Sequence, residues 1–183
     1  MTRLVLVRHG EAAAGFAADA DPGLSDTGRE QADTMAAAVT AEFGPQPILV
    51  SPLRRCRETA APLEGRWNSD AMVDAAVGEV ESPTADLAAR GAWLRGFMQS
   101  SWDDCEPELV AWRQSVVDRL VRIEEDTVVV SHFIAINAAV GEAMGERRVV
   151  CFRPDNCSRT VLEVRDSSLH VVELGGEAAT VVR

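Results

Sequence analysis

Three short apolar runs, at residues 4–7, 48–50 and 127–130, constrain the fold of this chain more than any other feature. Apolar and polar residues do not alternate in them, which is typical of strands buried on both faces of a parallel sheet. A segment with the periodicity of an amphipathic helix follows each run. This alternation predicts an α/β fold in which the three strands are parallel neighbours. We expect a three-layer α/β/α sandwich with a mostly parallel sheet.

Capping signals mark where two of the helices are expected to begin. Thr27 and Glu30 have the spacing of a capping box, and Gly44 is expected to end the helix that they start. Ser51 can cap the next helix, with Pro52 at the first helical position, which is a favoured pairing.

The second half of the chain contains both helical and strand-like segments. Residues 83–101 are expected to be helical but interrupted at Gly91 and Gly96. Residues 147–152 are expected to form a further strand. Residues 160–174 contain two partly alternating runs on either side of a polar turn, which predicts an antiparallel hairpin at the edge of the sheet.

The length and charge of the chain limit its organisation and its partners. With neither repeat nor linker, residues 1–183 are expected to form a single domain. No apolar run approaches the roughly 18 residues that a membrane span needs, so we expect a cytoplasmic protein with no membrane partner. The net charge of −11 argues against nucleic acid as a partner.

The residue composition excludes several kinds of chemistry. All 18 basic residues are arginine, and tyrosine is absent as well. A lysine-dependent phosphate loop and pyridoxal-phosphate chemistry are therefore excluded. The cysteines are scattered, which indicates reduced thiols, and we expect neither a metal site nor a cofactor. They are Cys56, Cys105, Cys151 and Cys157.

Side chains suited to a phosphoryl group follow each of the three apolar runs. Arg8 and His9 follow the first, Arg55 lies shortly after the second, and His132 follows the third. The carboxyl ends of parallel strands meet at one edge of a sheet, so we expect these residues to converge. Arginines offer bidentate donors to phosphate oxygens. A neutral imidazole can attack phosphorus, and a second, protonated imidazole could neutralise the developing charge.

Hydrolysis of a phosphate ester also needs a proton for the leaving oxygen. Glu79 and Glu81 are both candidates for the carboxylic acid that supplies it. Gly10, which follows the first imidazole, is expected to let the chain turn sharply with no Cβ in the way of a ligand.

Taken together, these segments resemble the histidine phosphatase superfamily, also called the phosphoglycerate mutase-like family. They occur in the family's order and extend over most of the chain, so the series is more specific than any one motif. The matching segments are Arg8-His9-Gly10-Glu11, residues 24–32 (LSDTGREQA), residues 51–60 (SPLRRCRETA), Glu79, Val130-Ser131-His132 and Asn156-Cys157-Ser158.

The resemblance implies a role for each matching side chain. His9 matches the nucleophile that becomes phosphohistidine. Arg8 and Arg55 match the arginines that bind the phosphate. Glu79 matches the catalytic acid, and His132 matches the second catalytic histidine of the phosphate pocket.

Other positions bear on substrate binding, and two of them depart from the family. Phe133 stands where the family usually has glycine, so its ring should either narrow the pocket or pack under the helix. Asn156 matches the family's late Asn-x-Ser segment and is expected near the substrate. Ala12 replaces the Ser or Thr of the mutases, which weakens a close likeness to them. Glu81 stays the alternative acid.

The favoured function is therefore a phosphomonoesterase that acts on a small phosphorylated metabolite or a phosphoprotein through phosphohistidine. The alternative is a phosphotransfer like that of cofactor-dependent phosphoglycerate mutase. The family's mutases are longer, whereas residues 80–131 leave little chain to close over the site. A non-catalytic phosphate-binding module is the second alternative. The hairpin at residues 160–174 offers an edge for a possible homodimer.

Overall fold

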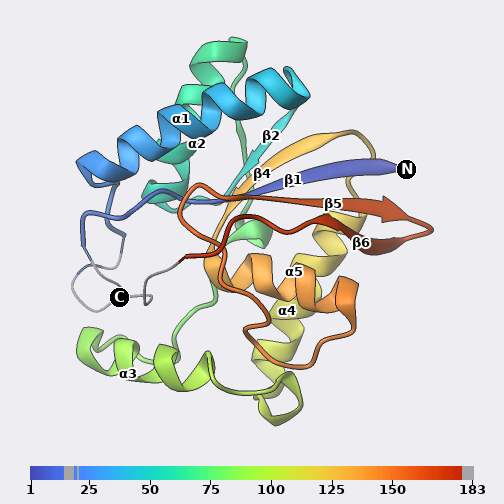
Figure 1. The fold of residues 1–183 in the computed structure, drawn as a ribbon. Helices are drawn as coiled ribbons and strands as arrows, with labels where there is room; N and C mark the ends of the chain where they lie inside the picture. Colours follow the sequence, from blue (N-terminus) through green and yellow to red (C-terminus); the bar gives the residue numbers. More distant parts are fainter. Residues whose placement is uncertain (15–18, 20, 179–183) are drawn as a thin grey trace.

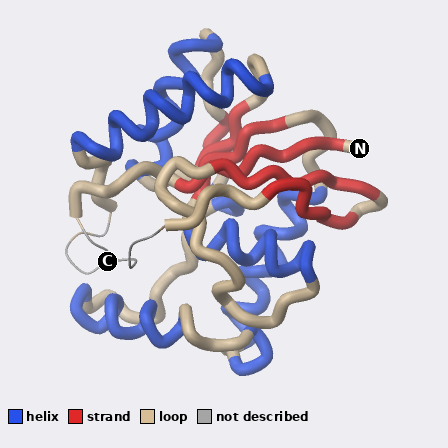
Figure 2. The backbone as a smooth tube through the Cα atoms, in the orientation of Figure 1, coloured by secondary structure: helices blue, strands red, loops and turns tan. Residues whose placement is uncertain are grey.

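The computed structural model describes residues 1–14, 19 and 21–178, and its strands form one six-stranded sheet (Figure 1 and Figure 2). The strands are β1 (Thr2–Arg8), β2 (Ile48–Val50), β3 (Met72–Val73), β4 (Thr127–Ser131), β5 (Arg159–Arg165) and β6 (Ser168–Glu173). The α-helices are α1 (Asp26–Phe43), α2 (Arg54–Trp67), α3 (Leu87–Phe97), α4 (Pro107–Val121) and α5 (Phe133–Met144). Two short 3₁₀ helices are η1 (Ala75–Val77) and η2 (Trp102–Asp104).

The strand order places the three predicted buried strands side by side. It is β3-β2-β4-β1-β5-β6. The first four strands in this order are parallel, whereas β5 runs antiparallel to β1 and β6 antiparallel to β5. Arg8 pairs with Ser131, and Val50 pairs with Val130, so the three central strands end at the same edge. The predicted mostly parallel sheet with an antiparallel edge hairpin is confirmed.

Side chains of β1 enter two apolar cores on opposite faces of the sheet. Val5 and Val7 pack with residues of α1 and α2, whereas Leu4 and Leu6 pack with residues of α4 and α5. Figure 1 shows α1 and α2 on one side of the sheet and α4 and α5 on the other. The strand is therefore apolar throughout because both of its faces are buried, and the predicted three-layer sandwich is confirmed.

A third apolar cluster joins the chain around α3 and η2 to the start of α5. Its buried members are Val80, Phe97, Trp102, Phe133, Ile134, Ala138 and Val149. The predicted interruption at Gly91 and Gly96 is wrong, since α3 runs through both. A glycine lowers the stability of a helix by about 1 kcal/mol but does not prevent it from forming.

Both predicted helix starts are wrong by a few residues. Helix α1 begins after Ser25, whose Oγ accepts a hydrogen bond from the backbone N–H of Gly28, so Thr27 and Glu30 form no capping box. Helix α2 begins after Leu53, with no side-chain cap. The serine expected to cap it is instead held by an imidazole of the site described below.

The strand predicted at residues 147–152 is also wrong, because one side chain binds the backbone donors of this segment. The Asn137 Oδ1 atom on α5 accepts hydrogen bonds from the backbone N–H groups of Cys151 (2.9 Å) and Phe152 (3.1 Å). Within the described residues, the segment's only strand-like pairing is an isolated bridge between Ser101 and Arg148. The segment therefore crosses α5 as irregular chain.

Candidate active site

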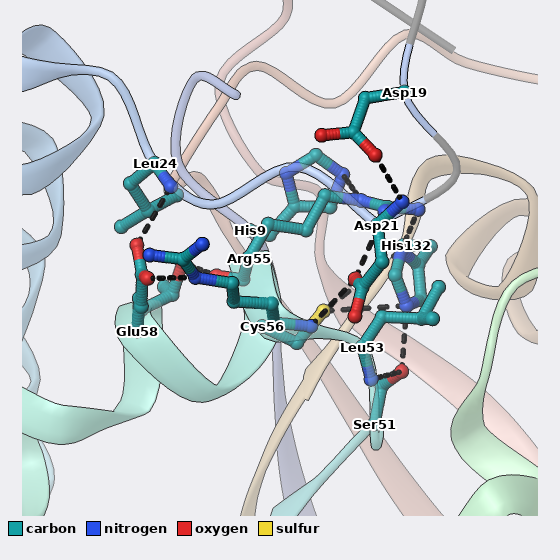
Figure 3. A network of polar contacts seen from close by, with 12 residues as sticks. His9, Asp19, Asp21, Leu24, Ser51, Leu53, Arg55, Cys56, Glu58 and His132 are labelled. Atoms are coloured by element: carbon teal, nitrogen blue, oxygen red, sulfur yellow. Dashed lines mark hydrogen bonds and ion pairs between the residues drawn. The ribbon is translucent and has the colours of Figure 1, made fainter. Parts of the chain in front are cut away.

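The ends of β1 and β4 and the first turn of α2 bring an arginine and two imidazoles together (Figure 3). The Arg55 Nε atom donates a hydrogen bond to His9 Nε2 at 3.2 Å, and Arg55 Nη2 lies 3.2 Å from His132 Nδ1. The centroids of the two imidazole rings are 5.2 Å apart. Three of the residues expected to converge at this edge of the sheet, His9, Arg55 and His132, are therefore in contact.

The His9 ring is held in one tautomer. Its Nδ1 atom lies 2.7 Å from the carbonyl oxygen of Gly10, so Nδ1–H donates to that oxygen. Its Nε2 atom accepts from Arg55 and therefore carries the lone pair. Burial, followed by the charges of Arg55 and Arg8, lowers the pKa of His9 to about 3. At neutral pH this imidazole is uncharged, and its Nε2 lone pair faces the Arg55 guanidinium.

The His132 ring is fully buried and is held from its other side by a hydroxyl. Because Arg55 donates to Nδ1, the proton lies on Nε2, which is 2.7 Å from Ser51 Oγ and 3.3 Å from Cys56 Sγ. Burial, and then the neighbouring His9 and Arg55, lowers the pKa of His132 well below its usual value. The second imidazole is therefore neutral here, not the protonated group considered from the sequence.

Two arginine side chains supply the positive charge of the site. The Arg55 side chain is buried, and its Nη1 atom lies 4.0 Å from Asp21 Oδ1. The same oxygen accepts a hydrogen bond from the backbone N–H of Arg54 at the start of α2, as an anion at a helix N-terminus does. Arg8 Nη1 donates to the carbonyl oxygen of Pro154 at 2.9 Å.

One of the two candidate acids is held at the site, and the other is exposed. The Glu79 carboxylate accepts the backbone N–H of Val80 at 3.0 Å and lies 3.5 Å from that of Ile134. Burial raises the pKa of Glu79 to about 7, although these hydrogen bonds and Arg55 oppose the shift. The carboxyl group therefore keeps a proton close to neutral pH. The Glu81 side chain is exposed.

A cavity of about 370 Å³ lies beside the candidate acid, with Arg55, Glu79 and Thr84 among its lining residues. A larger cavity, of about 870 Å³, is lined by Ile48 and Thr127, the first residues of β2 and β4. This larger cavity is therefore at the opposite edge of the sheet from the imidazoles. Only the smaller one is in a position to hold a group attached to a reacting phosphate.

Besides Arg8 and Arg55, three predicted substrate-binding positions, Gly10, Phe133 and Asn156, have surroundings that the sequence did not indicate. A Cβ on Gly10 would lie 2.6 Å from the carbonyl oxygen of Gly28, so close backbone packing against α1 requires this glycine, not a ligand as we expected. Asn156 Nδ2 donates to the carbonyl oxygen of His9 at 2.9 Å and so supports the backbone of that residue. Phe133 is 5% exposed.

Three residues of the site were missed by the sequence analysis. Thr59 Oγ1 accepts the backbone N–H of Gly10 at 3.0 Å and donates to the Arg55 carbonyl oxygen at 2.7 Å, which ties β1 to α2. Thr59 and Ser51 lie within a matching segment of the family resemblance, which could have identified them. No sequence pattern pointed to Asp21.

Two kinds of feature are absent from the part of the chain that the structure describes. No group of three His, Cys, Asp or Glu side chains is arranged to hold a metal ion. None of the described helices combines the length and the apolar character that crossing a membrane requires.

Comparisons with known proteins agree with the geometry of the site. A family model described as histidine phosphatase superfamily (branch 1) matches residues 4–176. A solved structure named mycobacterial hydrolase 1 is 25% identical, with a TM-score of 0.73, covering 97% of this chain and 99% of that one. No curated protein matches the chain.

Two further solved structures share the fold at lower identity. A mycobacterial glucosyl-3-phosphoglycerate phosphatase, solved with VO3, is 24% identical, with a TM-score of 0.72 and coverage of 97% of this chain and 100% of that one. A phosphoserine phosphatase from Entamoeba histolytica is 20% identical, with a TM-score of 0.74 and coverage of 98% of both chains.

Proposed function

Because the chain belongs to the histidine phosphatase superfamily, branch 1, we propose that it hydrolyses phosphate monoesters through a phosphohistidine at His9. The observation that carries this proposal is the state of that imidazole. Its Nε2 lone pair lies beside the Arg55 guanidinium, and its Nδ1–H is held by the Gly10 carbonyl. A neutral imidazole fixed in this tautomer can act as a nucleophile towards phosphorus.

In the first step, Arg8 and Arg55 bind the phosphate oxygens and His9 Nε2 attacks phosphorus. The N–P bond forms while the bond from phosphorus to the ester oxygen breaks. Glu79 gives its proton to that oxygen, so the leaving group departs as an alcohol. The developing charge on the transferred group is stabilised by the two guanidinium groups.

In the second step, water attacks the phosphohistidine. The Glu79 carboxylate, now ionised, takes a proton from the water as the new P–O bond forms and the P–N bond breaks. The products are inorganic phosphate and the original states of His9 and Glu79. The hydrogen bond from Nδ1–H to Gly10 persists through both steps, because only Nε2 forms a bond to phosphorus.

We propose a small phosphorylated metabolite as the substrate rather than a phosphoprotein. The volume of about 370 Å³ beside Glu79 suits a compact leaving group. The named phosphatases that share the fold act on phosphoserine and glucosyl-3-phosphoglycerate, which are small molecules. A cytoplasmic location fits the four free cysteines. A homodimer through β6 stays a prediction.

Hydrolysis is favoured over a mutase reaction by the limited cover of the site. Between Glu79 and β4, the chain forms only α3, η2 and α4, and α4 belongs to the core beneath the sheet. A mutase must protect the phosphohistidine from water until a hydroxyl of the substrate receives the phosphate. A parallel assay of 3-phosphoglycerate isomerisation separates the two reactions, because a mutase would interconvert the isomers faster than it releases phosphate.

The decisive test replaces the proposed nucleophile. His9→Ala should lower turnover of 4-nitrophenyl phosphate by at least about 10³-fold, because no other group can form the covalent intermediate. An acid-quenched reaction of the unmodified protein with ³²P-labelled substrate should contain label bound to the protein, and the variant should contain none. The matched control is His170→Ala, at an exposed histidine on β6. Retained turnover in the His9 variant would overturn the proposal.

A further inference from the structure

The phenylalanine that stands in place of the family's usual glycine contacts one of the two phosphate-binding arginines. Phe133 is the first residue of α5 and directly follows His132. Its ring is 5% exposed and belongs to the third apolar cluster, with Phe97 and Trp102. The guanidinium carbon of Arg8 lies over the ring, 5.2 Å from its centroid. This distance is within the range of a cation–π interaction.

Few other contacts hold this guanidinium in place. Among the described residues, the Arg8 side chain makes one hydrogen bond, from Nη1 to the Pro154 carbonyl oxygen at 2.9 Å. Its Nε atom is buried and has no hydrogen-bond partner there. One hydrogen bond leaves a guanidinium free to rotate about the donor. Arg8 is half-buried, and a cation that is partly buried loses hydration, which an aromatic face can partly replace.

We propose that Phe133 is a positioning residue for phosphate binding, because its aromatic face holds the Arg8 guanidinium in the orientation that meets a phosphate at His9. The inference rests on the proposed function, since it takes Arg8 as a phosphate ligand. Packing of the ring in the third apolar cluster keeps it from swinging away from the cation. The sequence allowed two roles for Phe133, narrowing the pocket or packing under the helix, and neither included this contact.

Ring fluorination tests the proposal, because it weakens the negative face of the ring while hardly changing its size. Phe133 would be replaced by 4-fluoro-, 3,5-difluoro- and 3,4,5-trifluorophenylalanine, and the Kd of inorganic phosphate measured by calorimetry. The Kd should rise with each added fluorine, by roughly fivefold to tenfold over the series. The same replacements at Phe152, another buried phenylalanine, serve as the control and should leave the Kd unchanged.

A second variant separates positioning from catalysis. Phe133→Leu keeps apolar volume but removes the aromatic face, so KM for 4-nitrophenyl phosphate should rise several-fold while kcat changes less. A Kd for phosphate that stays constant through the fluorinated series would overturn the inference and leave the proposed function intact. Failure of the unmodified protein to bind phosphate would overturn the proposed function as well.

Discussion

At the scale of single residues, burial gives two groups of the site the protonation states that the proposed phosphate transfer needs. The imidazole of His9 has a pKa of about 3 and is neutral, whereas the carboxyl group of Glu79 has a pKa of about 7 and keeps its proton. In both cases the largest cause is the loss of water around the charged form. Burial therefore favours a neutral imidazole and a protonated carboxyl group at the same pH, as the proposed mechanism requires.

The pH dependence of kcat/KM should follow from these two pKa values. The active form has neutral His9, above about pH 3, and protonated Glu79, below about pH 7. The rate should therefore decrease as the pH rises through about 7. Glu79→Gln should lower kcat/KM for an alkyl phosphate by about 10²- to 10⁴-fold, and by less for 4-nitrophenyl phosphate, whose leaving group needs no proton.

The control for this prediction is the second candidate acid of the sequence. Glu81→Gln should keep both the rate and the decrease above pH 7, because the Glu81 side chain is exposed. Steady-state kinetics from pH 4 to 9 measure both variants. If Glu81→Gln abolished the alkaline decrease and Glu79→Gln kept it, the roles would be reversed.

At the scale of elements, close backbone contact fixes the loop after β1 against the start of α1. A Cβ on Gly28 would lie 2.1 Å from the carbonyl oxygen of Glu11, and a Cβ on Gly10 would lie 2.6 Å from that of Gly28. The Glu11 carboxylate also accepts a hydrogen bond from Ser25 Oγ at 2.8 Å. The first turn of α1 therefore positions the backbone that follows His9.

Gly28→Ala should consequently destabilise the protein and lower its activity together. Overpacking of this kind costs about 1–3 kcal/mol in free energy of unfolding, and the loop must move away from α1. Gly65→Ala in α2 is the matched control, since its Cβ would meet nothing within 4 Å and should stabilise the helix by about 0.5–1 kcal/mol. Urea unfolding and phosphatase assays measure both effects. Unchanged stability in the Gly28 variant would contradict the prediction.

The arrangement of the strands could be predicted from the sequence, whereas individual side-chain contacts could not. The three apolar runs predict parallel neighbouring strands, and the meeting of Arg55 with two imidazoles follows from that topology. Contacts between individual side chains that are distant in the sequence cannot be predicted from the periodicity of apolar residues. Ser51 resembles a helix cap, yet His132 binds its hydroxyl. Asn137 on α5 likewise binds the backbone of a segment that resembles a strand.

At the scale of the whole molecule, burying the site makes the fold sensitive to acid. In an unfolded chain a histidine has a pKa of about 6.5, whereas His9 has one of about 3 in the fold and His132 is lowered as well. The unfolded chain therefore binds more protons as the pH falls from about 6.5 towards 3. Over this range the buried imidazole of His9 lowers the free energy of unfolding by about 1.4 kcal/mol per pH unit, and that of His132 acts in the same direction.

The raised pKa of Glu79 acts in the opposite direction. Its native carboxyl group holds a proton between about pH 4.5, the unfolded value, and about pH 7, so its contribution to stability decreases as the pH rises through that window. Between about pH 6.5 and 4.5, the effect of Glu79 on the free energy of unfolding is opposite in sign to that of one buried imidazole. Below about pH 4.5 this opposition ends, and the carboxylates whose pKa values the fold lowers, such as Glu58 and Asp74, begin to lose their stabilising contacts. The loss of stability with falling pH should therefore become steeper.

Replacing His9 shows how much its imidazole contributes to the pH dependence of the free energy of unfolding. His9→Asn removes the titrating group, so its free energy of unfolding should decrease less with falling pH than that of the unmodified protein, by about 1.4 kcal/mol per pH unit. Urea unfolding at pH 7, 5.5 and 4.5 measures the slopes, with His170→Asn as the exposed control. A single transition at each pH is expected if residues 1–183 form one domain. Equal slopes for His9→Asn and the unmodified protein would mean that the fold does not lower the pKa of His9. Its Nε2 atom would then be protonated below about pH 6.5 and could not attack phosphorus there.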